Sequence, residues 1–187
     1  MLIAQKTSKQ EKIWAFKHPF SAVKIKKLYR QVSPIYKQSL NKLLLDSFNN
    51  GGKLDAFRHT YFMAAFAQKV KVKKLRELGI AHEKGNQKQF IKQQTEEGEL
   101  ADSLSNVMDL NNNELGYKIG KENKNLSLEE LRQLIIKEIN EGKALIMKRN
   151  KSGNYLDCNN NIIDLKLYLH KWYVPKCLVS SDYIYKD

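Results

Sequence analysis

The sequence is poor in cysteine and in long apolar runs, and each shortage excludes a class of protein. Two cysteines cannot build a disulfide scaffold, and no CxxC pair indicates a zinc finger. No apolar run approaches the roughly 18 residues that a membrane-spanning helix needs. The glycine-rich phosphate-binding strings, the GxSxG string and the HExxH string are also absent. The sequence therefore does not name a substrate, although Cys158 and Cys177 could form one bridge outside the cytoplasm.

The composition is that of one folded, basic domain. The chain has 187 residues, of which 42% are hydrophobic and 28% charged, and this length can bury a core without disulfide support. Lysine and arginine number 33 against 20 acidic residues, which gives a net charge of +13. Such a balance favours contact with nucleic acid, anionic lipid or an acidic partner, without choosing among them.

Hydrophobic periodicity predicts a mainly α fold, a helical bundle with a small C-terminal β-hairpin. We expect helices over residues 21–48, broken or restarted at Pro34, then a central helix over 53–76 and another over 99–116. Residues 79–98 look looser, with Gly85 and Gly98 as punctuation. A capping box at Ser127 and Glu130 begins a helix that ends at Gly142.

The two ends of the chain differ from the middle. We predict a lead-in over residues 1–20, a helical domain over 21–142 that carries the site, and a segment over 143–187 packed on it. In that last segment, residues 144–147 and 162–163 are expected to pair as the hairpin, before an aromatic stretch over 168–173. No intact signal peptide is encoded, but residues 2–5 resemble the end of one.

One side of the predicted central helix carries residues of a candidate site. Asp55 and His59 are four residues apart, within reach of each other, on a helix that is apolar nearly all round and therefore buried. A buried carboxylate needs a partner, which can be Arg58 or a metal ion. The alternative is a purely structural ion pair.

A second candidate lies in the longest stretch without lysine or arginine. Between Lys92 and Lys118 there is no lysine or arginine, but there are six acidic residues: Glu96, Glu97, Glu99, Asp102, Asp109 and Glu114. Asp102, Asn106, Asp109 and Asn113 fall on one side of a helix. A stripe of oxygen ligands needs a cation, which can be a metal ion or Arg58 and His59 of the neighbouring helix.

His82 and Glu83 form the third piece, which we expect in the loop after the central helix. The pair can act as ligand plus general base, or as a helix cap. Hard cations such as Mg²⁺ or Ca²⁺ prefer carboxylate and amide oxygens, whereas Zn²⁺ would use the imidazoles with a carboxylate. In a metal-free version, His59 or His82 acts as the base and Arg58 holds an anionic group. His18 and His170 are interpreted as structural.

Three strings together resemble a known but uncharacterised bacterial domain. They are residues 51–59 (GGKLDAFRH), 81–86 (AHEKGN) and 108–116 (MDLNNNELG), and they resemble the pattern DAFRH…HE…MDLxNNxxG. That domain occurs in secreted proteins of Bacteroidetes-type bacteria and at the C-termini of wall-associated or toxin-like proteins. The resemblance covers residues 11–140 and implies a helical domain in an exported protein, but no activity. The tryptophan usual in the family is Phe62 here.

The leading hypothesis is an exported bacterial hydrolase, periplasmic or secreted, that acts on phosphoesters in lipid, cell-wall precursor or nucleic acid. An antibacterial role follows only by analogy with the toxin-like context. The candidate catalytic residues are His59, His82, Glu83 and Asp109, and the candidate substrate-binding residues are Arg58, Asn112 and Asn113. The candidate ligands of a divalent metal (Zn, Mg or Ca) are Asp55, His59, His82, Asp102 and Asp109.

The alternative is a non-catalytic module that binds an envelope component or a partner, with the same residues as a buried structural network. A nucleic-acid partner is the third choice, because the aromatic residues beside the C-terminal lysines are expected in the core.

Overall fold

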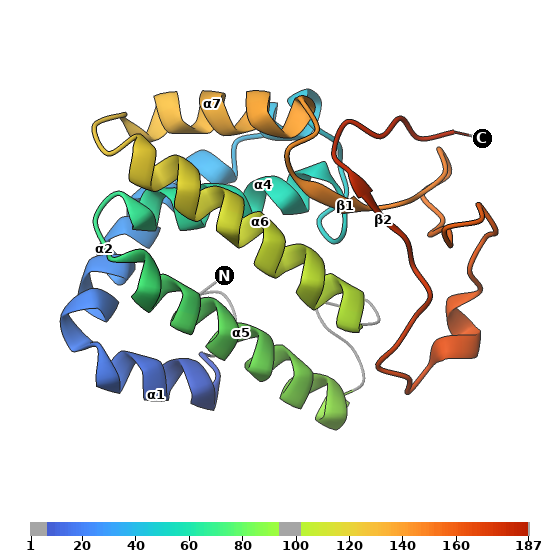
Figure 1. Cartoon of the computed structure of the whole chain (residues 1–187), viewed down its shortest axis with the longest axis horizontal. Helices are drawn as coiled ribbons and strands as arrows, with labels where there is room; N and C mark the ends of the chain where they lie inside the picture. Colours follow the sequence, from blue (N-terminus) through green and yellow to red (C-terminus); the bar gives the residue numbers. More distant parts are fainter. Residues whose placement is uncertain (1–6, 94–101, 187) are drawn as a thin grey trace.

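A computed structural model describes residues 7–93 and 102–186, and helices dominate this part of the chain (Figure 1). The α-helices are α1 (Lys9–Lys17), α2 (Pro19–Tyr36), α3 (Leu40–Leu44), α4 (Lys53–Ala67), α5 (Val72–Gln93), α6 (Ser103–Glu122) and α7 (Leu128–Asn140). They are followed by strand β1 (Leu145–Met147), the short 3-10 helix η1 (Leu165–Tyr168) and strand β2 (Leu178–Ser180). The predicted class, mainly α with a small C-terminal sheet, is confirmed.

Helix α4 is the centre of the fold. It is apolar on nearly every side, and almost all of its side chains are buried, as expected of a helix without a polar face. Helices α2, α6 and α7 surround it, and α5 runs below α6 with α1 against its lower side (Figure 1). The polar residues that α4 carries are therefore forced into contact with its neighbours.

Two glycines let α6 approach α4 unusually closely. A Cβ atom at Gly120 would lie 2.1 Å from the carbonyl oxygen of Ala64, and one at Gly116 would lie 2.4 Å from that of Thr60. Both distances are far shorter than any van der Waals contact, so only glycine fits at these positions. The hydroxyl of Thr60 donates to the carbonyl of Asn112 across the same contact (3.2 Å). This packing places the polar side of α6 against α4.

The N-terminal residues differ from the prediction. The expected lead-in contains α1, which begins with a capping box in which Ser8 and Glu11 exchange hydrogen bonds. This is the same S-x-x-E pattern as the one at Ser127, which is confirmed as the start of α7. Pro34 does not break α2; it lies inside the helix, two residues before its end.

The boundaries around α5 also differ. The central helix ends at Ala67, not at residue 76, because residues 68–71 turn the chain back along the bundle. Gly79 and Gly85, which the sequence analysis treated as part of a looser stretch, lie inside α5. There they allow close packing, since a Cβ at Gly79 would lie 3.1 Å from the Tyr117 hydroxyl and one at Gly85 2.7 Å from Ser8. The predicted loop at His82 and Glu83 is therefore wrong: both residues are helical.

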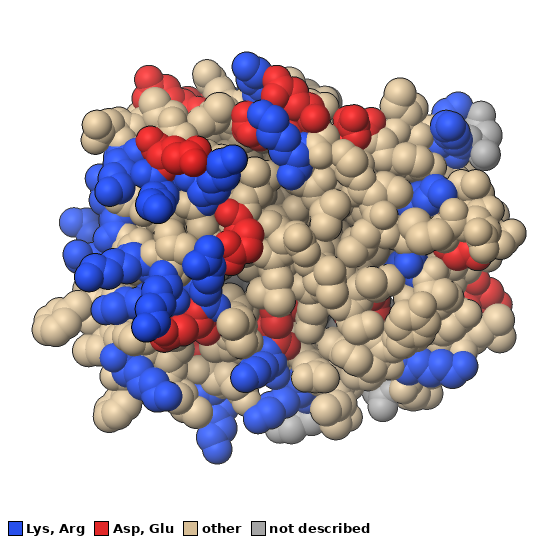
Figure 2. Space-filling view, viewed as in Figure 1, with Lys and Arg blue, Asp and Glu red and all other residues tan. Residues whose placement is uncertain are grey.

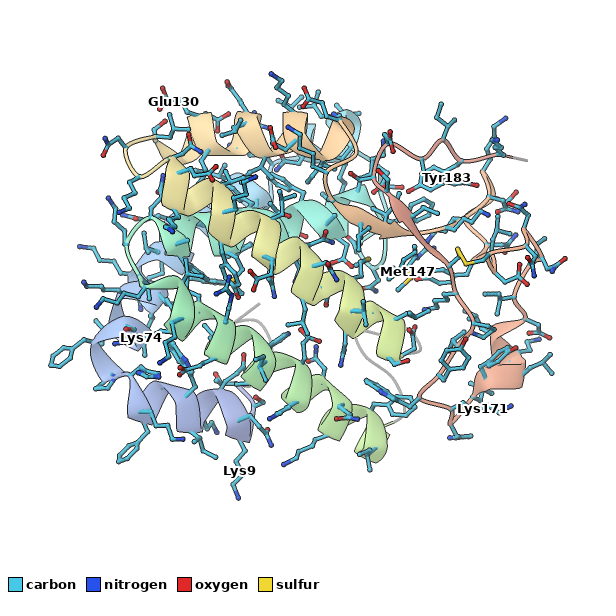
Figure 3. The ribbon with its side chains drawn as sticks, in the orientation of Figure 1. Lys9, Lys74, Glu130, Met147, Lys171 and Tyr183 are labelled. Carbon is cyan, nitrogen blue, oxygen red and sulfur yellow. A yellow bond between two sulfur atoms is a disulfide. The ribbon has the colours of Figure 1, made fainter. Side chains whose placement is uncertain are left out.

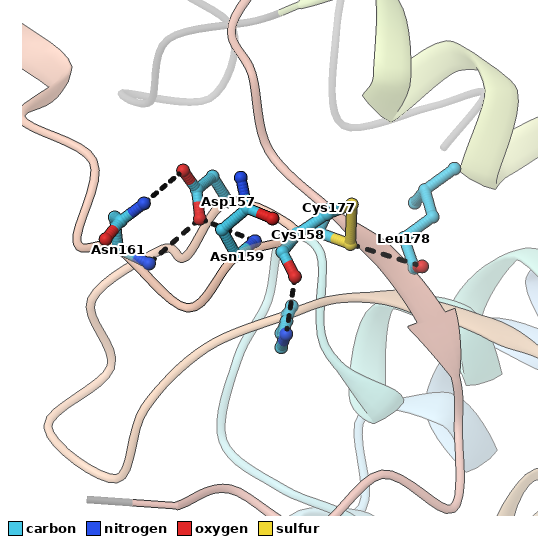
Figure 4. The surroundings of a disulfide bond; sticks show 7 residues. Asp157, Cys158, Asn159, Asn161, Cys177 and Leu178 are labelled. Atoms are coloured by element: carbon cyan, nitrogen blue, oxygen red, sulfur yellow. Dashed lines mark hydrogen bonds between the residues drawn. A yellow bond between two sulfur atoms is a disulfide. The ribbon is translucent and has the colours of Figure 1, made fainter.

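The C-terminal segment pairs differently from the expected hairpin. Strand β1 is antiparallel to β2, with Ile146 opposite Val179, whereas residue 162 forms only an isolated bridge with Leu156. A disulfide joins Cys158 to Cys177, with their Cα atoms 4.9 Å apart (Figure 4). The disulfide holds the segment before β2 beside Leu156, where the N–H of Cys177 donates to the Leu156 carbonyl. The chain then continues into β2, which pairs with β1.

Some sequence predictions fall on residues that the structure does not describe. These are the signal-peptide-like residues 2–5 and the first part of the acidic stretch, with Glu96, Glu97 and Glu99. The helix predicted from residue 99 is observed from Ser103 onward.

Candidate functional site

Three buried side chains from α4 and α6 converge in the described structure. The Nε2 atom of His59 lies 3.4 Å from Oδ1 of Asp55 and 3.2 Å from Oδ1 of Asp109, and these three atoms lie within 4.8 Å of one another. His59 is 1% exposed, Asp55 3% and Asp109 8%. Figure 3 shows how side chains fill the space between these crossing helices. The predicted grouping of Asp55, His59 and Asp109 is observed.

Arg58 supplies the positive charge of this cluster. Its Nη2 atom lies 2.7 Å from Oδ1 of Asp55 and 3.4 Å from Nε2 of His59. The other Asp55 oxygen accepts a hydrogen bond from the backbone N–H of Gly51 (2.7 Å). Burial alone would raise the pKa of Asp55, but Arg58, His59 and the Gly51 N–H together lower it below the ordinary value. Asp55 is therefore a carboxylate at neutral pH.

His59 is held in the neutral form. Its burial lowers the pKa below the ordinary value, and the nearby Asp55 carboxylate does not reverse the shift. Its Nδ1 atom is buried and has no hydrogen-bond partner among the described residues. A neutral imidazole with one nitrogen between two carboxylates can act as a metal ligand, or as a base through its free nitrogen.

His82 belongs to a second, adjacent cluster. Its Nδ1 lies 3.0 Å from Oε1 of Glu11 on α1, and its Nε2 lies 3.3 Å from the amide of Asn86, which also donates to Glu83 (3.4 Å). Burial would raise the pKa of Glu11, but His82 and Ser8 lower it. Glu11 was not among the predicted site residues. The capping-box pattern of Ser8 and Glu11 could have identified it as part of a helix.

A small cavity joins the two clusters. It is lined by His59, Arg58, His82 and Glu11, together with apolar side chains of α2, α4 and α5. Its volume is about 20 Å³, which is room for one water molecule. Both histidines therefore face one enclosed space, and α1 closes it.

Asp102 lies outside this group. It caps the N-terminus of α6 by accepting from the N–H groups of Leu104 (2.8 Å) and Ser105 (3.1 Å). Its other oxygen lies 2.6 Å from Nζ of Lys176, and both side chains are almost fully buried. The position of Asp102 on one stripe of α6 had suggested a metal ligand. In the structure its side chain caps the helix and pairs with Lys176, so it does not reach the cluster around His59.

The two predicted amides have different surroundings. Asn112 clamps β1, because its Oδ1 accepts from the Leu145 N–H (2.9 Å) and its Nδ2 donates to the Leu145 carbonyl (2.9 Å). Asn113 is buried beside Gly79, and its Oδ1 has no hydrogen-bond partner within the described residues. Asn112 is thus fully used by the fold, whereas Asn113 keeps an acceptor in the interior.

A much larger cavity lies elsewhere. A groove of about 630 Å³ is formed by the α4–α5 turn and the C-terminal half of α6. Two of its lining residues are acidic, Glu114 and Glu122, and six are cations: Lys69, Lys71, Arg76, Lys118, Lys121 and Lys124. None of the candidate residues lines it, so cavity size and catalytic side chains do not coincide in this molecule.

Comparison with known proteins identifies the family. A family model described as a domain of unknown function (DUF6973) matches residues 12–143. The chain belongs to the DUF6973 family. The match contains α2 to α7 and the whole Asp55–His59–Asp109 cluster, and it agrees with the expectation of an uncharacterised domain. No curated protein matches the chain. No solved structure matches it either.

Proposed function

We propose that this DUF6973 protein is a hydrolase of phosphoesters that works outside the cytoplasm, with Asp55, His59 and Asp109 as its centre. The observation that carries the proposal is a neutral, buried imidazole whose Nε2 contacts two carboxylates while its Nδ1 remains without a hydrogen bond. Buried polar groups normally satisfy their hydrogen bonds, and exceptions cluster at functional sites.

In the reaction, His59 acts as the general base. The carboxylates fix the ring through Nε2–H, and Nδ1 accepts a proton from water. The water oxygen then bonds to phosphorus as the ester P–O bond breaks, and the imidazolium returns the proton to the leaving alkoxide. Arg58, whose side chain is 14% exposed, binds the phosphoryl oxygens.

A divalent metal is the second form of the same centre. One imidazole nitrogen and two carboxylate oxygens within 4.8 Å form a donor set that suits Zn²⁺, Mn²⁺ or Mg²⁺. Binding would require Arg58 to release Oδ1 of Asp55, which frees its guanidinium for the substrate. The metal would neutralise charge that develops on the phosphoryl group.

Access to the centre requires movement. The cavity between His59 and His82 has room for a single water but not for a phosphoester. Glu11 of α1 closes it through its contact with His82. We therefore propose that the first turn of α1, which carries Glu11, moves away from α5 when substrate enters.

An export context supports this proposal. The Cys158–Cys177 disulfide suits an oxidising compartment, and the sequence resembles domains of secreted Bacteroidetes-type proteins. The toxin-like proteins among them make an antibacterial role part of the proposal.

Activity and metal content test the proposal together. The parent, His59→Gln and Asp109→Asn are purified without chelator, assayed for metal and incubated with a nitrophenyl phosphodiester, phosphatidylglycerol and RNA, with and without EDTA. We expect at least a 100-fold lower kcat in His59→Gln and an unchanged kcat in the exposed control Lys118→Ala. A parent that cleaves none of these phosphoesters, either as purified or after addition of Zn²⁺, Mn²⁺ or Mg²⁺, contradicts the proposal.

A non-catalytic module is the second candidate, and burial favours it. All three members of the centre are buried, and Asp55 already has Arg58 and Gly51 as partners. In that case the network fixes the packing of α4 against α6, and the function lies on the surface. Absence of catalysis in the parent itself, together with an equal loss of stability in His59→Gln and Asp109→Asn, would select this candidate.

A further inference from the structure

Four apolar side chains protrude from the corner between α1 and α2. Phe16 is 88% exposed, Phe20 85%, Val23 70% and Ile13 47%. Two phenylalanines that contribute almost nothing to the core are unusual on one corner of a small protein, since burying a phenylalanine side chain is favourable. Contiguous exposed apolar groups of this kind mark interaction sites.

The α1–α2 stretch that forms this corner is strongly cationic. Between Glu11, which is buried, and Asp46 the chain has no acidic residue. The same stretch has eight exposed cations: Lys12, Lys17, Lys24, Lys26, Lys27, Arg30, Lys37 and Lys42. Figure 2 shows lysines and arginines gathered, with some acidic residues among them, at the end of the molecule where α2, the start of α5 and the end of α6 lie, while the middle of that face is largely uncharged.

The corner is held firmly from beneath. The Trp14 indole donates to the carbonyl of Lys74 (2.9 Å), and His18 Nε2 lies 2.8 Å from Glu77 of α5. These contacts use the inner side of α1 and leave its outer side to solvent. The exposed apolar groups are thus presented on a fixed scaffold and are not the result of a frayed end.

We propose that the α1–α2 corner docks onto an anionic lipid surface. Ile13, Phe16, Phe20 and Val23 enter the boundary between headgroups and acyl chains, and the flanking lysines contact lipid phosphates. Apolar side chains beside lysines are the combination that binds peripheral proteins to membranes. A nucleic acid fits less well, because Ile13 and Val23 have no ring on which a base could stack. The proposal does not depend on the catalytic centre.

Vesicle binding tests this proposal. The parent and Phe16→Ser/Phe20→Ser are sedimented with vesicles of phosphatidylcholine alone or with 40% phosphatidylglycerol. A matched control is Leu167→Ser/Ile184→Ser, which removes two side chains that are 66% and 76% exposed in the C-terminal segment. We expect the corner variant to bind anionic vesicles at least tenfold more weakly than the parent, and the control to bind as the parent does. Binding should weaken with salt and be slight on pure phosphatidylcholine.

A fluorescent probe gives an independent readout of insertion. The tryptophan emission of Phe16→Trp should shift to the blue on addition of anionic vesicles. The shift that vesicles cause in Ile184→Trp should be no larger than the shift in the parent. A parent that does not bind anionic vesicles, or a corner variant that binds as well as the control, overturns the proposal. RNA binding of the parent and of the corner variant is measured in parallel. If the corner variant loses RNA binding but still binds vesicles as the parent does, the proposal is also overturned.

Discussion

The interior of the α4–α6 pair and the corner between α1 and α2 use charge in opposite ways. Inside, a few charged groups each have a specific partner, as Asp55 has Arg58 and Asp102 has Lys176. At the corner, eight cations have no acidic neighbour in their stretch of sequence. A buried charge must be compensated individually, because desolvation costs several kcal/mol, while exposed charges are screened and act collectively. The comparison separates residues that fix the structure from residues that are free to bind a partner.

The largest expected effect is on the buried Asp102–Lys176 pair. Replacing Lys176 by methionine leaves the carboxylate of Asp102 buried without its cation, 2.6 Å from the former Nζ position. We expect the free energy of unfolding to fall by about 3–5 kcal/mol, measured by urea denaturation. A loss below about 1 kcal/mol would show that the cap hydrogen bonds of Asp102 suffice to stabilise it.

A slightly smaller effect is expected at the contact between α4 and α6. A methyl group added by Gly120→Ala would meet the Ala64 carbonyl at 2.1 Å, so the two helices must separate. We expect a loss of about 1–3 kcal/mol in the same assay. Lys121→Ala, on the adjacent residue of the same helix, should stay within about 0.5 kcal/mol of the parent. Equal stability of the two variants would refute the close packing.

The neutral state of His59 predicts a pH dependence. Its folded pKa lies below the ordinary value of 6.5, so the unfolded chain binds a proton that the native state does not. Stability is then fully present above about pH 6.5 and falls as the pH drops, by up to about 1.4 kcal/mol per pH unit.

This window lies above the range in which Glu11 and Asp55, whose ordinary pKa values are 4.5 and 3.8, lose their contributions. Urea midpoints between pH 7.5 and 5.5 should therefore decline in the parent and decline less in His59→Gln. Parallel profiles for the two proteins would mean that His59 does not carry the effect.

The smallest effect is expected at an exposed ion pair. Arg76 binds Glu114 with two hydrogen bonds of 2.7 Å, but the two side chains are 56% and 49% exposed. Solvent and salt screen such a pair, so Arg76→Gln should leave the urea midpoint at the parent value. A loss as large as that of Lys176→Met would break the distinction between interior and surface charge.

The fold was largely predictable because helices leave local patterns. The burial of α4, the capping box of α7 and the i, i+4 pair Asp55–His59 follow from spacing along a single helix. The extent of α5 was not predictable, because glycine usually interrupts a helix. Gly79 and Gly85 instead lie inside α5, where they allow neighbouring residues to pack closely. The predicted helix boundaries were wrong where the packing between helices, and not the local sequence preference, decided the conformation.

The site was predictable only in part. The acidic stretch indicated that α6 faces Arg58 and His59 or a metal ion, and Asp109 does meet His59, although this imidazole is neutral. Nothing in the spacing indicated that Asp102 would turn to Lys176, which is 74 residues further along the chain, or that His82 would pair with Glu11. Such partners are distant in sequence, and periodicity carries no information about them.

The sequence by itself therefore determined that this is a basic helical protein with a buried Asp–His pair on its central helix, since these properties depend on composition and on a repeat of 3.6 residues. The tertiary structure alone decided which groups meet: Asp109 reaches His59 because Gly116 and Gly120 admit α4 at backbone distance, and β1 pairs with β2 across the disulfide loop. It also decided that Phe16 and Phe20 stay outside, because Trp14 occupies the inner side of α1. Which apolar side chains of a surface helix remain exposed depends on how the helices pack together, and the hydrophobic pattern of a single helix does not decide it.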